Sequence, residues 1–333
     1  MSGLGSVAPD VYRRARTVAD EILYDQGRRV GILLPRDWSA HNLPLDTGVD
    51  GTTESWFART EVVAECAPGA TLAIRLRFLQ PQRRTVERYL DGTGFVPTSR
   101  LDVDGWTVAT AEESIRHERD LTVDLDEVRR APVEARFEAV GVTELEVARD
   151  ATGAVRGRIR RTCKPLQLRV QVAATDAGLV VPMVRLRVVV ENVTDGVPAD
   201  APPVVAAAHS TVGTHCLLAL SDGGFVSLLD PPAWAIDAVR ECTNIHAFPV
   251  LAGDGGREDL VVSAPVLLPD HPHGAPGTYG DELDAAGSAP SQAKPLPTPL
   301  TSATYPIGPS PATVAPVASA ASAQWVVLRK ASR

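Results

Sequence analysis

Between about residue 28 and residue 195 the sequence runs through one short strand pattern after another. The segments TLAIRLRF (71–78) and VRLRVVVEN (184–192) alternate arginine with aliphatic residues. This period of two is typical of an antiparallel sheet with one face on the core and one face in water. About ten such segments, separated by Gly, Asp and Pro turns, predict a mainly β fold: an antiparallel β-sandwich or open barrel over residues 28–200.

Three other regions flank this body. Residues 1–27 contain an amphipathic helix over 8–24, with Val11, Ala15, Val18 and Ile22 on one face, and we expect it to pack on the body. Residues 201–284 form an α+β section. Residues 285–333 are rich in Ala, Pro and Ser with almost no charge, and that composition predicts a disordered tail.

The α+β section contains one ambiguous stretch and one clear helix pattern. The stretch VVAAAHSTVGTHCLLAL (204–220) fits either a helix or a buried pair of strands. The segment PPAWAIDAVREC (231–242) predicts a helix with proline in its first turn and Asp230 as its cap. Two further strands are expected, at AFPVLAG (247–253) and DLVVSAPVLL (259–268).

Net charge and hydropathy limit the kind of partner. The formal net charge is −8, whereas a nucleic-acid-binding protein needs a basic surface, so we expect no nucleic-acid partner. The basic run from Arg156 to Lys164 alternates and is interpreted as the solvated face of a strand. No stretch is apolar enough for a signal peptide or a membrane span, which predicts a cytoplasmic protein without a membrane partner. Four cysteines are then expected to be reduced thiols: Cys66, Cys163, Cys216 and Cys242.

Metal binding is the first chemistry to weigh. The candidate ligands are Cys242, His246, His271 and His273, a set of thiolate and imidazole groups that suits nickel or zinc. They do not show the CxxC or HExxH spacing that marks a zinc site. Buried cysteines and surface histidines explain these residues more simply, so we expect no cofactor and keep nickel or zinc as the alternative.

Nucleophilic catalysis is the second kind of chemistry to consider. Cys216 or Cys242 could act as a thiolate with a neighbouring histidine as base, and Ser263 could join His271 and Asp270. The Ser-Ala-Pro sequence around Ser263 lacks the glycines of a nucleophile elbow. We therefore assign no catalytic residue.

Binding residues are expected in two proline-rich loops, DPPAW (230–234) and DHPHG (270–274). Proline fixes the backbone and aspartate turns or caps it, so an ordered loop of this kind is suited to a partner surface. The candidates are Asp230, Trp234, Asp270 and His271. We expect the Trp234 ring to be largely buried against the sheet.

Several segments resemble one family. They are FLQPQRRTVE (78–87), VRLRVVVENVT (184–194), AAHSTVGTHCLLAL (207–220) and, most densely, the stretch from FVSLLDPPAWA to APGTYGD (225–281). Together they resemble an actinobacterial protein family encoded beside high-affinity nickel–iron hydrogenases. Two departures are a shorter segment before GILLP (31–35) and the Ala/Pro-rich tail, which stands where an acidic, helical region is expected.

The resemblance implies a non-enzymatic accessory protein for assembly, maturation or docking of a nickel–iron hydrogenase. The expected partners are hydrogenase subunits or maturation proteins. Two alternatives stay open: a metal-dependent or thiol enzyme that uses the His and Cys residues between 209 and 273, and a β-sandwich protein-interaction module.

Overall fold

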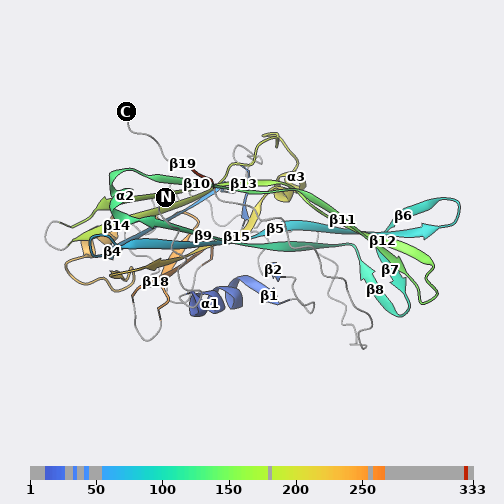
Figure 1. Cartoon of the computed structure of the whole chain (residues 1–333), viewed down its shortest axis with the longest axis horizontal. Coiled ribbons are helices and arrows are strands. Elements are labelled where there is room, and N and C mark those ends of the chain that lie inside the picture. Colours follow the sequence, from blue (N-terminus) through green and yellow to red (C-terminus); the bar gives the residue numbers. More distant parts are fainter. Residues whose placement is uncertain are drawn as a thin grey trace, which may run out of the picture.

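The structure is a computed structural model that describes residues 12–26, 33–35, 41–44, 55–178, 182–253, 258–266 and 326–328. It is built mainly from antiparallel strands in two large open sheets, which confirms the predicted β-sandwich. Figure 1 shows the two sheets stacked along most of the length of the molecule. Across these residues, no helix has the length and apolar character needed to cross a membrane.

The first large sheet has six strands. Its order is β16 (Gly224–Phe225), β4 (Phe57–Glu65), β14 (Met183–Asn192), β13 (Leu166–Asp176), β10 (Val133–Ala139) and β19 (Val326–Leu328). β13 shows the predicted alternation most clearly, because every second residue from Leu166 to Ala174 is buried. Within the segment 285–333, for which composition predicts disorder, the structure describes only β19, which pairs with β10.

The second large sheet has nine strands. Its main path is β11 (Val142–Arg149), β12 (Val155–Cys163), β5 (Thr71–Leu90), β15 (Thr211–Leu220), β18 (Leu260–Ala264) and β17 (Phe248–Leu251), with β3 (His41–Asn42), β6 (Gly94–Thr98) and β9 (Ala111–Asp124) alongside. β15 lies between β5 and β18, so the section after residue 200 shares this sheet with the strands that precede it.

The main core lies between the two sheets. It joins side chains from both, among them Leu72, Phe78, Phe137, Leu168 and Leu186, each at most 1% exposed. Phe78 and Phe137 meet edge to face across the sandwich, with ring centroids 5.5 Å apart. Burial of this aliphatic layer is the main force that holds the two sheets together.

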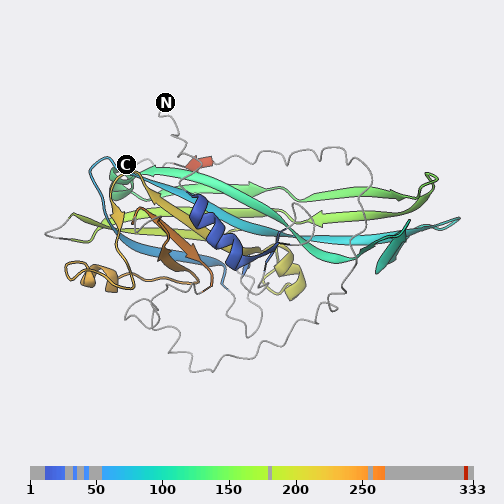
Figure 2. The same cartoon turned by 90° about the horizontal axis from the view of Figure 1, so that it is seen from below.

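Helix α1 (Arg13–Leu23) covers the outer face of the nine-stranded sheet, where it lies across the strands in Figure 2. Ala15 and Ala19 are fully buried against Leu79, Val212 and Leu217 of that sheet. The helix therefore packs on the body as predicted, but its buried face is formed by Tyr12, Ala15, Ala19 and Leu23, whereas Val18 of the predicted face is only partly buried. A small sheet of β1 (Tyr24–Gln26) and β2 (Leu33–Pro35) follows it.

One end of the molecule is an arm, formed by the far part of β5 with β6, β11, β12 and the hairpin β7 (Arg100–Val103)–β8 (Trp106–Ala109) (Figure 1). It has its own small core, made of Val86, Leu101, Val103, Val108, Ala148 and Ile159. Arg158 and Arg160 of the predicted basic run lie here on β12 and pair with Glu87.

The remaining helices are short: α2 (Leu125–Arg130), α3 (Pro203–Ala208) and α4 (Ile236–Arg240). The ambiguous stretch 204–220 is a helix followed by one strand, α3 and then β15, which combines the two alternatives rather than choosing one. Every residue of β15 is buried because the strand lies in the middle of a sheet that is covered on both faces.

Candidate functional site

A groove of about 520 Å³ opens beside the end of β4, where the DPPAW loop passes. Its walls come from four parts of the chain that are distant in sequence: residues 65–68 at the end of β4, Pro182 before β14, residues between 222 and 234 after β15, and Glu258 before β18. We call it the acidic groove, for the reason given below. It contains two of the predicted binding residues, Asp230 and Trp234.

Gly223 and Gly224 are among the residues that line the acidic groove. Gly223 has φ +110°, and a Cβ there would lie 2.1 Å from the carbonyl oxygen of Glu65. Only glycine allows both this backbone conformation and this close approach. The chain can therefore enter β16, where Gly224 pairs with Glu65 and Phe225 with Ala64.

The DPPAW loop is held by its flanks. The Ser227 hydroxyl accepts hydrogen bonds from the backbone N–H groups of Leu229 (3.2 Å) and Asp230 (3.1 Å). The predicted cap role of Asp230 is wrong. The N-cap of α4 is Ala235, it has no side-chain cap, and an extra turn at residues 233–235 separates the prolines from the helix. The Asp230 carboxylate is left exposed at the groove.

The prediction that Trp234 is buried is also wrong, since this side chain is 47% exposed. Ala235, Ala238, Val239 and Cys242 are the residues that face the sheet, where they pack with Val63 and Met183. Their spacing of three, four and seven fits one helical face, and Trp234 precedes that face by one residue, about 100° around the axis. The ring is therefore directed outward, and Leu229 of the same segment is 58% exposed as well.

The groove is acidic. Four exposed carboxylates line it, those of Glu65, Asp222, Asp230 and Glu258, and its lining includes no lysine or arginine. None of the four forms an ion pair with a described residue. Four like charges in one groove create a negative potential there, and this potential favours a cationic group on a partner.

The CTN sequence that follows α4 is a clamp on β4. The Asn244 side chain accepts from the backbone N–H of Glu61 (2.7 Å) and donates to the Glu61 carbonyl (3.1 Å). The backbone N–H of Thr243 donates to the Glu61 carboxylate at 2.9 Å. Asn244 thus copies the hydrogen bonds of a neighbouring strand and fixes the base of the Trp234 segment, a role that the sequence analysis missed.

Of the predicted metal ligands, two can be placed. Cys242 is buried, and its thiol donates a weak hydrogen bond to the Ala238 carbonyl at 3.6 Å, whereas His246 is exposed on the loop beyond Asn244. In the described part of the chain, no three His, Cys, Asp or Glu side chains come together in a group that could hold a metal ion. Asp270, His271 and His273 lie outside the described residues.

The thiols are poor nucleophiles in this fold. Burial raises the pKa of both Cys216 and Cys242 to about 12, so each stays a protonated thiol near neutral pH. Ser263 is buried as well, with its hydroxyl 2.7 Å from that of Thr60. The candidate nucleophiles are therefore closed to a substrate.

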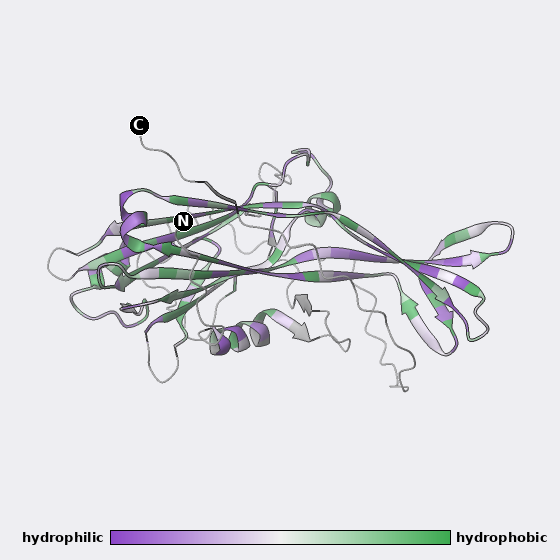
Figure 3. Ribbon diagram, viewed as in Figure 1, coloured by the Kyte–Doolittle hydropathy of each residue, from purple (hydrophilic) through white to green (hydrophobic). Residues whose placement is uncertain are grey.

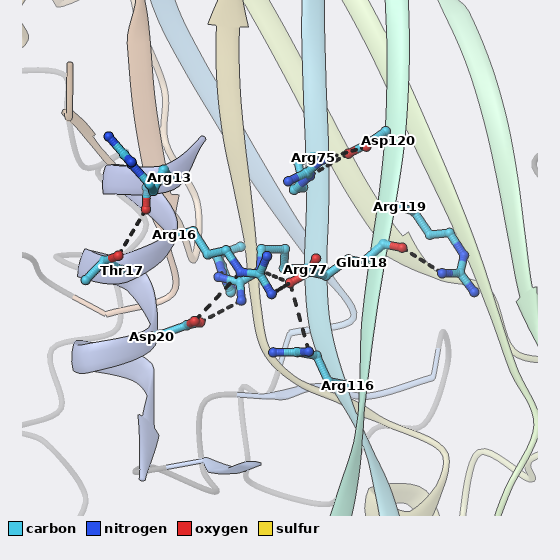
Figure 4. A network of polar contacts seen from close by, with 11 residues as sticks. Arg13, Arg16, Thr17, Asp20, Arg75, Arg77, Arg116, Glu118, Arg119 and Asp120 are labelled. Carbon is cyan, nitrogen blue, oxygen red and sulfur yellow. Dashed lines mark hydrogen bonds and ion pairs between the residues drawn. The ribbon is translucent and has the colours of Figure 1, made fainter. Parts of the chain in front are cut away.

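A second polar cluster lies beneath α1 and is shown in Figure 4. Arg77 on β5 is fully buried, and its guanidinium donates to Asp20 of α1 (2.6 Å), Glu118 of β9 (3.0 Å) and His215 of β15 (3.1 Å). Arginine has no acceptor, so His215 accepts through Nε2 and its protonated Nδ1 donates to the Gly213 carbonyl at 2.7 Å. The prediction of a wet arginine face on β5 is wrong at Arg77, because α1 covers that face.

This cluster holds the helix to the sheet rather than forming a ligand site. Burial, with the nearby Arg77 charge, lowers the pKa of His215 to about 3, so the imidazole stays neutral and acts as an acceptor. The Arg77 guanidinium also lies near the Tyr24 ring, 5.8 Å from its centroid. The sequence contained one signal for this cluster, an amphipathic helix upstream of a strand that carries arginine. This signal did not identify which arginine the helix would cover.

Comparison with known proteins adds no assignment: no protein-family model matches the chain, and no curated protein matches it.

Proposed function

We propose that this protein is a non-enzymatic accessory protein that docks a partner protein in the acidic groove. The observation that carries the proposal is the exposed Trp234 ring, which a clamped and packed segment holds beside four carboxylates. A large apolar side chain at a fixed position is typical of the residue that dominates a protein–protein interface.

The apolar part of this surface is preorganised. Trp234 and Leu229 both belong to the segment that Asn244, Ser227 and the Ala235–Val239 packing hold in place. A partner that covers both side chains removes apolar surface from water and orders little of this chain in doing so.

The charged part selects the partner. Four carboxylates without a basic neighbour in the groove lining favour a segment that carries lysine or arginine beside an apolar or aromatic residue. On the basis of the resemblance described above, we propose that this segment belongs to a nickel–iron hydrogenase subunit or to one of its maturation proteins.

The test is binding of each purified hydrogenase subunit and maturation protein to the full chain by biolayer interferometry. Trp234→Ala should weaken the productive pair by at least about tenfold, as expected for an anchor residue. Trp106→Ala is the matched control, because Trp106 is 40% exposed but lies on the arm, and it should leave the affinity unchanged.

Absence of binding to every one of these proteins would contradict the hydrogenase proposal. Equal losses for Trp234→Ala and Trp106→Ala would show that the groove is not the docking site. A metal bound in stoichiometric amount, or a turnover lost on Cys242→Ala, would favour the enzyme alternative instead.

A further inference from the structure

The outer edge of β11 has no partner strand among the described residues. β11 forms the end of the nine-stranded sheet and pairs only with β12 among the described strands. Its register with β12 is regular from Val142 to Ala148 and shifts only at the last step. A regular strand edge of this length offers backbone N–H and C=O groups to a further strand.

The side chains of β11 are exposed to an unusual degree. Seven of its eight residues are exposed, and these include Leu145 (56%), Val147 (47%) and Val142 (39%). Figure 3 shows hydrophobic and hydrophilic residues mixed along the arm strands at this end of the molecule. Exposed edge strands are usually protected by charged side chains, by proline, by a bulge or by a covering segment. Among the described residues β11 has no proline and no covering segment, its register shift comes only at the last step, and its charged side chains are Glu144, Glu146 and Arg149.

The two faces of β11 differ in chemistry. Leu145 and Val147 lie on one face, opposite Arg160 and Arg158 of β12. Glu144 and Glu146 lie on the other face, where Glu146 pairs with Arg161 (3.0 Å) and no ion pair to a described residue is found for Glu144. A strand added to this edge therefore meets carboxylates on one face and aliphatic side chains on the other.

From this geometry we infer a second interaction surface: β11 accepts an extended partner segment by antiparallel strand addition, and that segment alternates basic with aliphatic residues. Main-chain hydrogen bonds to this edge supply affinity, and the alternating side chains supply register. Arginine or lysine would pair with Glu144 and Glu146, while valine or leucine would cover Leu145 and Val147. The inference stands on the arm alone and is independent of the acidic groove.

A second copy of this chain fits the edge less well. The antiparallel register that places Leu145 opposite its own counterpart also places Glu144 opposite Glu146 of the other chain. Like charges directly opposite each other destabilise a strand pair. Self-pairing is therefore an outcome that the experiment must be able to detect.

The test uses two synthetic peptides, acetyl-TRVRVRVT-amide and acetyl-TEVEVEVT-amide, and hydrogen–deuterium exchange of the full chain. The Arg/Val peptide should bind at least about tenfold more tightly than the Glu/Val peptide and should slow exchange at residues 142–148. In Glu144→Lys/Glu146→Lys this preference should reverse, because the carboxylates on the edge are replaced by cations.

The matched control is Asp195→Lys/Asp200→Lys, which makes the same change in net charge in an exposed loop. It should retain the wild-type preference to within about twofold, as expected for a distant charge. Equal affinity for both peptides, or binding without slower exchange at β11, would overturn the inference. So would slow exchange of β11 in the free chain together with a dimer by light scattering, because a second copy would then occupy the edge.

Discussion

Two of the clusters of charged side chains in this molecule, one beneath α1 and one in the acidic groove, are completed differently. Beneath α1 the buried Arg77 meets two carboxylates and a neutral imidazole from the same chain. In the acidic groove four carboxylates face water without a basic partner among the described residues. The first cluster is completed within the fold, whereas the proposal above assigns the second to a partner protein.

From this comparison we expect Arg77→Ala to lower the free energy of unfolding more than any other substitution considered below. Removing the guanidinium takes the closest basic partner from Asp20 and Glu118 and leaves them the more exposed Arg16, at 3.9 Å and 3.2 Å. Loss of one partner of a buried ion pair costs about 3–5 kcal/mol. The measurement is urea unfolding of the full chain. Arg185→Ala is the control on β14, because its partner Glu241 is 68% exposed, and it should cost less than about 1 kcal/mol. Similar costs for the two variants would contradict the contrast.

Gly223→Ala should have the next largest effect, and it acts on the groove. A side chain at φ +110° is strained, and its Cβ would clash with the Glu65 carbonyl, so the expected cost is at least about 2 kcal/mol. Gly196→Ala is the control. Gly196 also has a positive φ of +73° but has open space around it, so strain without a clash should cost less. Equal shifts in thermal midpoint would show that the close approach of β16 to β4 does not matter.

Protonation of His215 should have a smaller effect on the free energy of unfolding, and this effect depends on pH. In the unfolded chain it binds a proton near pH 6.5, whereas in the folded chain it stays neutral down to about pH 3. The unfolded state therefore binds more protons in this window, and stability falls as the pH drops from 6.5 toward 3, by about 1.4 kcal/mol per pH unit at most. His215→Gln, which keeps an acceptor for Arg77, should reduce this slope in urea titrations between pH 6 and pH 4.5. An unchanged slope would mean that His215 titrates normally in the folded chain.

The sequence predicted where the strands lie, but it did not predict which strand faces are covered by other segments of the chain. Alternation along β5 and β14 placed the aliphatic residues correctly, because the side-chain period of a strand is a local property. The same alternation could not show that Arg77 lies under α1 while Arg185 faces Glu241, since coverage depends on contacts between distant segments.

The candidate site shows the same limit. The DPPAW loop was identified from its residue types, and the structure places Asp230 and Trp234 together at one groove. The outward direction of Trp234 depends on where α4 begins, and one extra turn after the prolines changed that direction. Glu65, Asp222 and Glu258 carry no local signal, because the groove arises from segments that are distant in sequence and meet where β16 pairs with β4.

The smallest expected effect on stability is that of Trp234→Ala. A half-exposed ring contributes little to the core, so this substitution should change the free energy of unfolding by less than about 1 kcal/mol. Val239→Ala on the buried face of α4 is the contrast, and it should cost more because that side chain packs in the core beside Val63 and Met183. A Trp234→Ala cost of several kcal/mol, measured by urea unfolding, would show that the ring is structural after all.

The most direct test of the account is titration calorimetry of each candidate partner, the hydrogenase subunits and maturation proteins proposed above, with a variant in which the four groove carboxylates become amides. These changes are Glu65→Gln, Asp222→Asn, Asp230→Asn and Glu258→Gln, which keep the shape of the groove and remove its charge. If the groove is the docking site, the variant should keep the wild-type thermal midpoint, lose at least about tenfold in affinity and show a weaker dependence of binding on salt. Wild-type affinity and an unchanged salt dependence in a folded variant would contradict the account.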